Sequence, residues 1–228
     1  MKLSKIILSV SFYRRWITRF IQCRYYNSFP GKSVPDLIDI HRKQKENWDV
    51  LSEDASSHMS QSDHEKRSAF KLGLIDSEPG HCLEIGCESG WFGNMLLEKY
   101  PETKYTGIDF RIEAFKKSDN MNHNLLLANA VHLPFKNDSF DLFLAFHIIE
   151  HIRDIKAFAK DMHRIVKDNS IIILCVPLGF DTDPCHRWHF MTKNGWVGFI
   201  KRELDLKPIQ HFVDNSVPGE YTGIYRKC

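Results

Sequence analysis

The chain has 228 residues, of which 43% are apolar, so it can bury the core of one domain of ordinary size. Its 31 basic and 29 acidic residues leave a formal net charge of +2, which argues against binding of nucleic acid through overall positive charge. The six cysteines form no CxxC pair, so we expect a reducing, cytoplasmic compartment and no disulfide framework. The most apolar runs, Leu142–Ile149 and Ile171–Phe180, are shorter than the roughly 20 residues of a membrane-spanning helix.

The first 30 residues differ from the rest of the chain in their charge. Residues 1–35 contain seven basic and no acidic side chains, and apolar side chains recur every three to four residues from Leu3 to Ile21. This pattern predicts a basic amphipathic helix over 1–30. Three roles are open to it: packing on the following domain, contact with an anionic membrane surface, and service as a mitochondrial transit peptide. A secretory signal is disfavoured because the apolar stretch is short and lacks a small-residue cleavage site.

Residues 31–61 are predicted to be a linker, and residues 62–228 a single domain. The domain opens with a helix to about Ile75, whose start is marked by the capping-box spacing of Ser62 and Glu65. From there on, short apolar runs alternate with amphipathic stretches, and a Pro218-Gly219 turn separates the last two runs. This order predicts a Rossmann-like α/β fold with a mostly parallel seven-stranded sheet and an antiparallel C-terminal hairpin.

The expected strands are His81–Gly86, Tyr105–Asp109, Asn124–Ala128, Leu142–Phe146, Ser170–Val176, Leu206–Val213 and Tyr221–Arg226. The expected helices between them are Trp91–Lys99, Ile112–Ser118, Asp154–Val166 and Thr192–Glu203. Ligands of such sheets bind beyond the carboxyl ends of the strands, so we expect function in the loops that follow them.

A loop with glycines, Leu83–Gly93, joins the first expected strand to the next helix. A dinucleotide fingerprint has glycine at the middle position of GxGxxG, so that backbone amides can reach a pyrophosphate, but this loop has Glu88 there. The carboxylates of Glu84 and Glu88 would repel phosphate and attract a cation. S-adenosylmethionine carries a sulfonium and an ammonium group and no phosphate, so the loop suits this cofactor.

Polar residues also follow the next three expected strands. Asp109 ends the second strand about 20 residues beyond the glycine loop, where a carboxylate can accept hydrogen bonds from both ribose hydroxyls. Asn129 and Ala130 follow the third strand, where an adenine edge would arrive, and His147 follows the fourth.

Several stretches together resemble the class I S-adenosylmethionine-dependent methyltransferases, over a region from about Ser62 to Cys228. The closest likeness is to the small-molecule branch that includes quinone-biosynthesis and glycan-modifying enzymes. The stretches that carry the resemblance are Leu83–Gly93, Asp109, Asn129–Phe135, Ser139–His151 and His163–Pro177.

The resemblance implies the class I methyltransferase fold and a set of cofactor-binding residues. Glu84, Gly86 and Gly90 would hold the methionine moiety, Asp109 the ribose, and Asn129 and Ala130 the adenine. We add Glu88 and His147 to this set. Glu88 replaces the glycine that is usual in the family, at a cost of roughly 1 kcal/mol or more if the turn needs a positive φ. Asn129 replaces the commoner aspartate, and its carbonyl oxygen can still accept from the adenine amino group.

The segment His147-x-x-Glu150-His151 has the letter order of an inverted zinc-protease motif. That motif needs a long helix and a third ligand, whereas this segment directly follows an apolar strand. We therefore expect no bound metal, and a zinc hydrolase that uses His147, Glu150 and His151 is kept as an alternative.

The loop after the fifth expected strand, Asp181–Phe190, is rich in histidine and aromatic residues. Methyl transfer is an in-line displacement, and it needs a general base only when the acceptor holds its proton tightly. Histidine suits a hydroxyl acceptor near neutral pH, so we predict His186 or His189 as the base or acceptor contact, with His151 next. The alternative is that these residues pack against the helix that Thr192 caps.

The residues favour methyl transfer from S-adenosylmethionine to a small-molecule, glycan or lipid-linked acceptor, at a hydroxyl oxygen. We expect a cytoplasmic enzyme without a nucleic-acid partner, which residues 1–25 could bring to a membrane surface as a peripheral protein. A non-catalytic S-adenosylmethionine-binding module is an alternative because Glu88 breaks the glycine pattern.

Overall fold

The computed structural model describes residues 61–115, 124–178, 186–190, 192–214 and 219–227, all of which belong to the unit Ser52–Cys228. The basic helix predicted over 1–30 lies outside the described residues, as does the linker up to residue 60. No helix among the described residues is long and apolar enough to cross a membrane.

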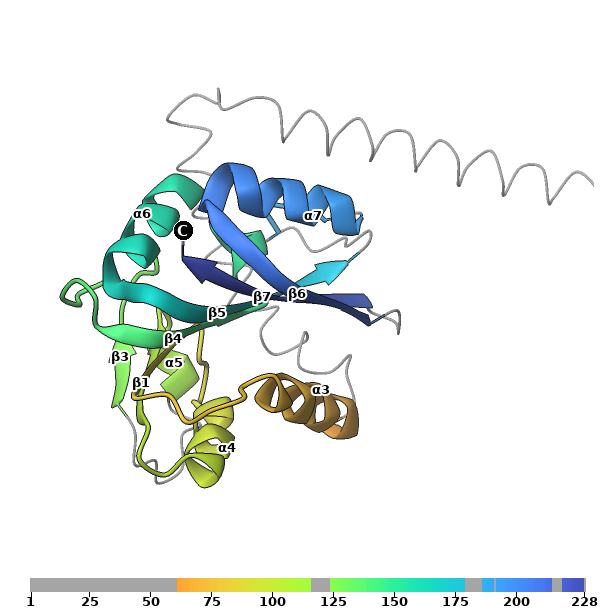
Figure 1. Cartoon of the computed structure of the whole chain (residues 1–228). Coiled ribbons are helices and arrows are strands. Elements are labelled where there is room, and N and C mark those ends of the chain that lie inside the picture. The colour runs from red at the N-terminus through yellow and green to blue at the C-terminus, as the bar shows by residue number, and fades with distance from the viewer. Residues whose placement is uncertain (1–60, 116–123, 179–185, 191, 215–218, 228) are drawn as a thin grey trace, which may run out of the picture. The chain divides into compact units, whose positions relative to one another are not determined.

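Helices and strands alternate along the described chain, as the sequence predicts (Figure 1). In chain order they are α3 (Gln61–Gly73), β1 (His81–Ile85), α4 (Trp91–Lys99), β2 (Lys104–Asp109), α5 (Ile112–Phe115), β3 (Asn124–Leu127), β4 (Phe140–Phe146), the 3-10 helix η1 (Ile149–His151), α6 (Ile155–Ile165), β5 (Val166–Leu178), α7 (Lys193–Phe199), the π-helix η2 (Ile200–Leu204), β6 (Leu206–Asp214) and β7 (Gly219–Lys227).

The helix caps agree with the sequence in part. The Thr192 side chain accepts a hydrogen bond of 3.1 Å from the backbone N–H of Gly195 and begins α7, as predicted. Asp154 caps α6 in the same way. The cap predicted at Ser62 is wrong, because α3 already includes Gln61. The last predicted helix changes at Ile200 into the π-helix η2, which ends where Asp205 adopts a positive φ of 49°.

The seven strands form one sheet in the order β3-β2-β1-β4-β5-β7-β6. Strands β1 to β5 pair in parallel, and β7 runs antiparallel to both β5 and β6. The predicted antiparallel C-terminal hairpin is therefore confirmed. The strand order reverses between β1 and β4, and the loops beyond these two strands meet where ligands of such sheets bind.

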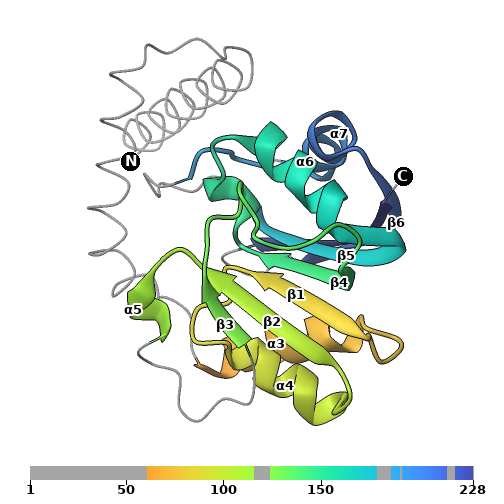
Figure 2. The same cartoon turned by 90° about the vertical axis from the view of Figure 1, so that its left-hand side faces the viewer.

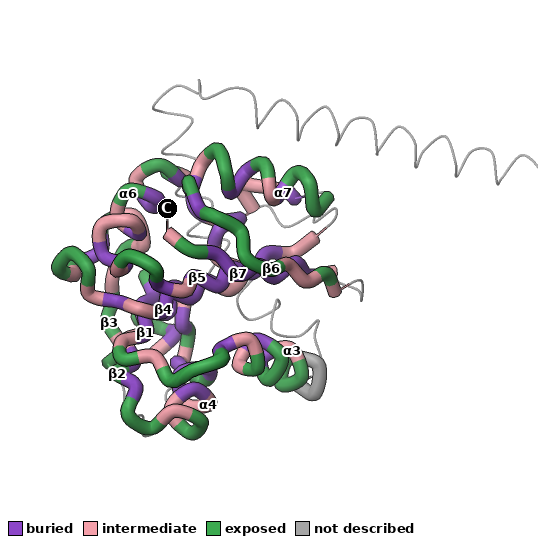
Figure 3. Tube along the Cα trace, viewed as in Figure 1, coloured by how far each residue is buried: buried purple, intermediate pink, exposed green. Residues whose placement is uncertain are grey.

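Helices cover both faces of the sheet, with α3 and α4 on one face and α6 and α7 on the other (Figures 1 and 2). Strand side chains alternate between the two faces, so Phe143 joins the core beneath α6 and α7, and Leu142 and Leu144 join the core beneath α4. Burial on both faces explains why the central strands are mainly apolar, and Figure 3 shows the buried residues gathered there.

Candidate functional site

The loop after β1 is a tight turn with three residues at positive φ. Gly86 has a φ of 71° and Gly90 a φ of 75°, which glycine adopts at little cost. Glu88 lies between them with a φ of 48°. The turn therefore needs a positive φ at Glu88, as the sequence analysis considered. Because Glu88 has a Cβ, this backbone conformation is strained.

Gly86 also allows a close approach between the two loops at the point where the strand order reverses. A Cβ atom at Gly86 would lie 2.0 Å from Cδ1 of Ile148, in the loop after β4. On its other side, the loop is fixed to β2, because the backbone N–H groups of Gly86 and Cys87 donate to the carbonyl oxygen of Ile108 at 2.7 and 3.0 Å. The glycine loop is therefore held between β2 and the segment that carries His147.

Glu84 lies beneath this loop and is only 4% exposed. The hydroxyl of Tyr105, on β2, donates a hydrogen bond to the Glu84 carboxyl group. Burial raises the pKa of Glu84 to about 8, and the hydrogen bond from Tyr105 opposes this rise. A carboxyl group with this pKa is largely protonated at neutral pH, and a cation bound beside it would favour the charged form.

Asp109 lies at the end of β2 and is bonded to the glycine loop itself. One carboxylate oxygen accepts from the backbone N–H of Glu88 at 3.2 Å, and the other accepts from the backbone N–H of Arg111 at 2.9 Å. The Arg111 guanidinium also approaches Asp109, with Nε at 3.5 Å. Oδ2 keeps a further lone pair for a ribose hydroxyl, whereas Oδ1 accepts both N–H groups of Arg111, so part of the acceptor capacity of Asp109 fixes the surrounding backbone.

The segment predicted to meet adenine follows β3 beside Asp109, whose carbonyl oxygen accepts from the N–H of Ala128 at 2.9 Å. Asn129 is exposed, and its side-chain oxygen accepts from the N–H of Val131 at 3.1 Å, within its own turn. Arg164 of α6 fixes the far end of the segment, because its guanidinium donates to the carbonyl oxygens of Leu133 at 2.8 Å and Phe135 at 2.5 Å.

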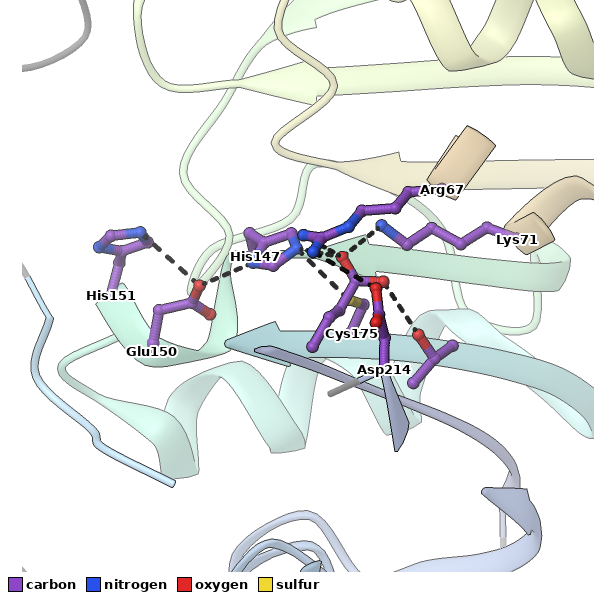
Figure 4. A network of polar contacts seen from close by, with 9 residues as sticks. Arg67, Lys71, His147, Glu150, His151, Cys175 and Asp214 are labelled. Carbon is purple, nitrogen blue, oxygen red and sulfur yellow. Dashed lines mark hydrogen bonds and ion pairs between the residues drawn. The ribbon is translucent and has the colours of Figure 1, made fainter. Parts of the chain in front are cut away.

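His147 has a φ of 55° and lies in a network of charged side chains beyond β4 (Figure 4). Its Nε2 lies 2.8 Å from the Glu220 carboxylate, and its Nδ1 lies 3.6 Å from Glu150. Burial disfavours the charged imidazole, but contacts with Cys175, Glu150 and Glu220 outweigh it and raise the pKa of His147 well above its ordinary value. His147 therefore holds a proton and is not suited to accept one.

Glu220, on β7, is the centre of this network and is only 3% exposed. Besides His147, two cations of α3 reach it, with Lys71 Nζ at 3.1 Å and Arg67 at 3.5 Å. Although burial opposes charge, the contacts with His147 and Lys71 hold the pKa of Glu220 well below its usual range. The network fixes α3 over the carboxyl ends of the strands. No local sequence pattern predicted it, because its members lie far apart in the chain.

The predicted acceptor residues His151 and His186 lie next to each other, with ring centroids 4.6 Å apart. His189 is one step further away, 6.1 Å from His186 between centroids. The segment that carries them is held against η1, since the N–H groups of Arg187 and Trp188 both donate to the carbonyl oxygen of Glu150. Residues 181–185 of the predicted acceptor loop lie outside the described residues.

The structure thus brings the predicted residues together in two neighbouring groups. Glu84, Gly86, Glu88, Gly90 and Asp109 surround the turn after β1, and the histidines lie beyond β4 and β5. The residues of the first group fit S-adenosylmethionine, because their carboxylates suit a cationic ligand and Gly86 leaves no side chain in the turn. The long helix of an inverted zinc-protease motif is not formed, since η1 spans three residues and excludes His147.

Comparisons of sequence agree with this geometry. A family model described as a methyltransferase domain matches residues 83–174. An uncharacterised protein of Methanocaldococcus jannaschii is 34% identical over 94 residues, which cover 41% of this chain and 39% of the relative. A malonyl-[acyl-carrier protein] O-methyltransferase of Legionella pneumophila is 25% identical over 68% of this chain and 58% of the relative. The chain spans about half the length of the curated relatives it matches.

Among solved structures, the fold is similar to that of 1,6-didemethyltoxoflavin-N1-methyltransferase from Burkholderia thailandensis, a complex that contains S-adenosylhomocysteine. The TM-score is 0.67 at 12% identity, and the match covers 88% of this chain and 92% of the other. This likeness confirms the predicted fold. Residues 83–174 therefore match a methyltransferase domain, and the described part of the chain has the fold of an S-adenosylmethionine-dependent methyltransferase.

Proposed function

We propose that this chain transfers a methyl group from S-adenosylmethionine to a small-molecule acceptor. The observation that carries the proposal is the strained, glycine-flanked turn after β1, which has carboxyl groups of Glu84, Glu88 and Asp109 around it. A phosphate-bearing dinucleotide would be repelled there, whereas a ligand with a sulfonium and an ammonium group would be attracted.

In this proposal Glu84, Gly86 and Gly90 hold the methionine moiety, and Asp109 holds the ribose. Asn129 and Ala130 meet the adenine. Bound S-adenosylmethionine supplies a methyl group that its sulfonium already activates, so the protein has to align the acceptor with that methyl group and to exclude water. Ile148 packs against Gly86 of the glycine loop, and the segment that it begins is suited to line the acceptor side of the site.

The acceptor atom is proposed to be a hydroxyl oxygen. A hydroxyl needs a base near neutral pH, and the histidines around Glu150 are candidates, with the exception of the protonated His147. By their names, the Legionella relative is an O-methyltransferase and the Burkholderia protein methylates nitrogen. Neither name mentions a glycan or a lipid-linked acceptor. Such an acceptor is therefore a separate part of the proposal and needs its own test.

Calorimetry with S-adenosylmethionine and S-adenosylhomocysteine tests the cofactor assignment. We expect wild type to bind both, and Asp109→Ala to lose at least about tenfold in affinity, since charge-assisted hydrogen bonds contribute about 1.5–3 kcal/mol. Asp141→Ala is the matched control, because Asp141 bonds to His81 and Lys167 at the start of β4 and should not touch the cofactor. No binding by folded wild type would overturn the proposal.

Turnover separates an enzyme from a non-catalytic binding module, the second candidate. Its support is Glu88, which strains the turn at a φ of 48°. Release of S-adenosylhomocysteine should be measured against a panel of hydroxyl acceptors, with His186→Ala and His189→Ala beside wild type. Acceptor-dependent turnover that falls in at least one variant would support the base assignment. Full turnover in both variants would end that assignment, and binding without any turnover would favour the binding module.

Contact with a membrane surface is proposed for residues 1–25 on the basis of their charge pattern alone. Full-length protein should sediment with vesicles that contain anionic lipid, and a chain that starts near Ser52 should not. Equal sedimentation of the two would remove this reason to consider a lipid-linked acceptor.

A further inference from the structure

The Glu150 carboxylate is the buried polar group that the structure satisfies least well among the residues it describes. The residue is only 1% exposed, and neither carboxylate oxygen accepts a hydrogen bond from a described residue. The nearest cationic atom is Nδ1 of His147 at 3.6 Å, beyond ordinary hydrogen-bond length. A buried carboxylate whose oxygens accept no hydrogen bond is destabilising, and a ligand that binds these oxygens directly would relieve this cost.

Two further histidines converge on the same carboxylate. His151 lies with Nε2 4.0 Å from Oε1 of Glu150 (Figure 4). His186 completes the group, and one ligand atom from each of Glu150, His151 and His186 lies within 4.8 Å of the other two. Two imidazole nitrogens and one carboxylate oxygen are the ligands of many catalytic zinc and iron sites.

The arrangement is fixed by the backbone and does not rest on side-chain rotamers alone. The Glu150 carbonyl oxygen accepts from the N–H groups of Arg187 at 2.6 Å and Trp188 at 3.0 Å. The Trp188 indole N–H donates to the carbonyl oxygen of Ile152 at 2.6 Å, and Phe190 is buried beside Trp196. These bonds hold His186 against the 3-10 helix that carries Glu150 and His151.

A second group of similar composition, His147, Cys175 and Glu220, lies nearby and provides an internal comparison. Its carboxylate is already neutralised by Lys71 and Arg67, which bind the same Oε2 atom as His147 does. A metal ion there would have to displace two cations that are themselves well packed. The ion pairs that the described residues form with the Glu150 carboxylate come from histidines at 3.6 and 4.0 Å, so a metal ion is favoured in this group.

We propose that Glu150, His151 and His186 bind a divalent first-row transition-metal ion such as Zn²⁺. A tetrahedral ion with bonds of about 2.1 Å separates its ligand atoms by about 3.4 Å, so the three side chains would draw together by about 1.5 Å or less. The ion supplies the direct partner that the Glu150 oxygens lack, and it leaves a coordination position for a further ligand. From the sequence we expected no bound metal, and the proposed site differs from that expectation.

The role of the ion rests on the proposed methyl transfer, whereas its binding does not. A hydroxyl group at the open position would lose its proton more easily, because a bound cation lowers the pKa of the oxygen that it coordinates. In that case His151 and His186 act as ligands, and His189 remains as the candidate base.

The test uses the full chain without a polyhistidine tag, stripped with a chelator and titrated with Co²⁺ and Zn²⁺. Wild type should bind one Co²⁺ and show visible absorption bands of a coordinated ion, which Zn²⁺ abolishes. Glu150→Gln and His186→Ala should each weaken binding at least about tenfold. His132→Ala is the matched control, since it removes an exposed histidine outside the group and should bind as wild type does.

The metal site would be overturned by no binding to folded wild type, or by equal binding to wild type, Glu150→Gln and His186→Ala. A near-ultraviolet sulfur-to-cobalt band that Cys175→Ser abolishes would place the ion in the other group and would also overturn it. Calorimetry with S-adenosylmethionine on the same samples keeps the two proposals apart. Cofactor binding without metal binding refutes the metal site alone, and metal binding without cofactor binding refutes the methyl-transfer proposal alone.

Discussion

The strain at Glu88 can be measured by comparing two substitutions at that position. A residue with a Cβ at a φ of 48° costs about 1–2 kcal/mol relative to its relaxed backbone, and glycine does not bear this cost. Glycine in turn loses about 0.5–1 kcal/mol through the greater freedom of the unfolded chain. The Arg111–Glu88 ion pair adds little, because the distance is 3.9 Å and the Glu88 side chain is 74% exposed.

Glu88→Gly and Glu88→Ala both remove the ion pair, so their difference isolates the backbone. We expect the glycine variant to be the more stable of the two by about 1 kcal/mol, which corresponds to about 2–4 °C in Tm for a domain of this size. Thermal unfolding followed by circular dichroism measures this difference. Equal Tm values, or a more stable alanine variant, would refute the positive φ at this position.

The same pair of variants reports on the role of the carboxylate in cofactor binding. Because the carboxylate is largely exposed, solvent screens its attraction for a cation, and we expect both variants to lose about fivefold or less in affinity for S-adenosylmethionine. A loss of a hundredfold in both would mean that Glu88 contacts the cofactor directly.

Three further predictions concern the surroundings of the site. The pKa of Glu84 is about 8 in the folded chain, so the free energy of unfolding of wild type should fall as the pH rises from about 4.5 to 8. Glu84→Gln should flatten this dependence when both proteins are unfolded with urea. Parallel curves for the two proteins would contradict the raised pKa. Arg164→Ala removes the hydrogen bonds that hold the segment after β3, and it should raise the Kd for S-adenosylmethionine several-fold in calorimetry. Arg202→Ala, at an exposed position, should leave the Kd unchanged. Equal effects of the two substitutions would exclude a positioning role for Arg164. Thr192→Ala removes the cap of α7 and should lower the free energy of unfolding by about 1 kcal/mol, and an unchanged value would show that the cap bond contributes nothing.

Much of the fold could be predicted because burial leaves a local pattern in the sequence. The helix Trp91–Lys99 is found at its predicted bounds, and the seven predicted strands each match a strand of the sheet. Their apolar runs reflect burial on both faces, which any central strand of a covered parallel sheet must show. The glycine loop was also readable, because Gly86 and Gly90 adopt positive φ values that other residues avoid.

Boundaries and caps were harder to predict, because they depend on packing more than on local preference. β5 begins at Val166, directly after α6, where the sequence predicted a strand only from Ser170. Ser62 has the spacing of a cap, yet the helix already includes Gln61. Such local hydrogen-bonding patterns stabilise a helix end by only about 1 kcal/mol, so tertiary contacts can shift it.

The sequence by itself determined the alternation of strands and helices and the acidic, glycine-flanked turn, since both are encoded by residues close together in the chain. Only the tertiary structure decided which distant side chains share a site. Glu220 reaches His147 across 73 positions, and His186 reaches Glu150 because the chain after β5 is bonded to η1. The reason is physical: periodicity records which face of an element is buried, whereas the meeting of loops depends on which strands are neighbours in the sheet.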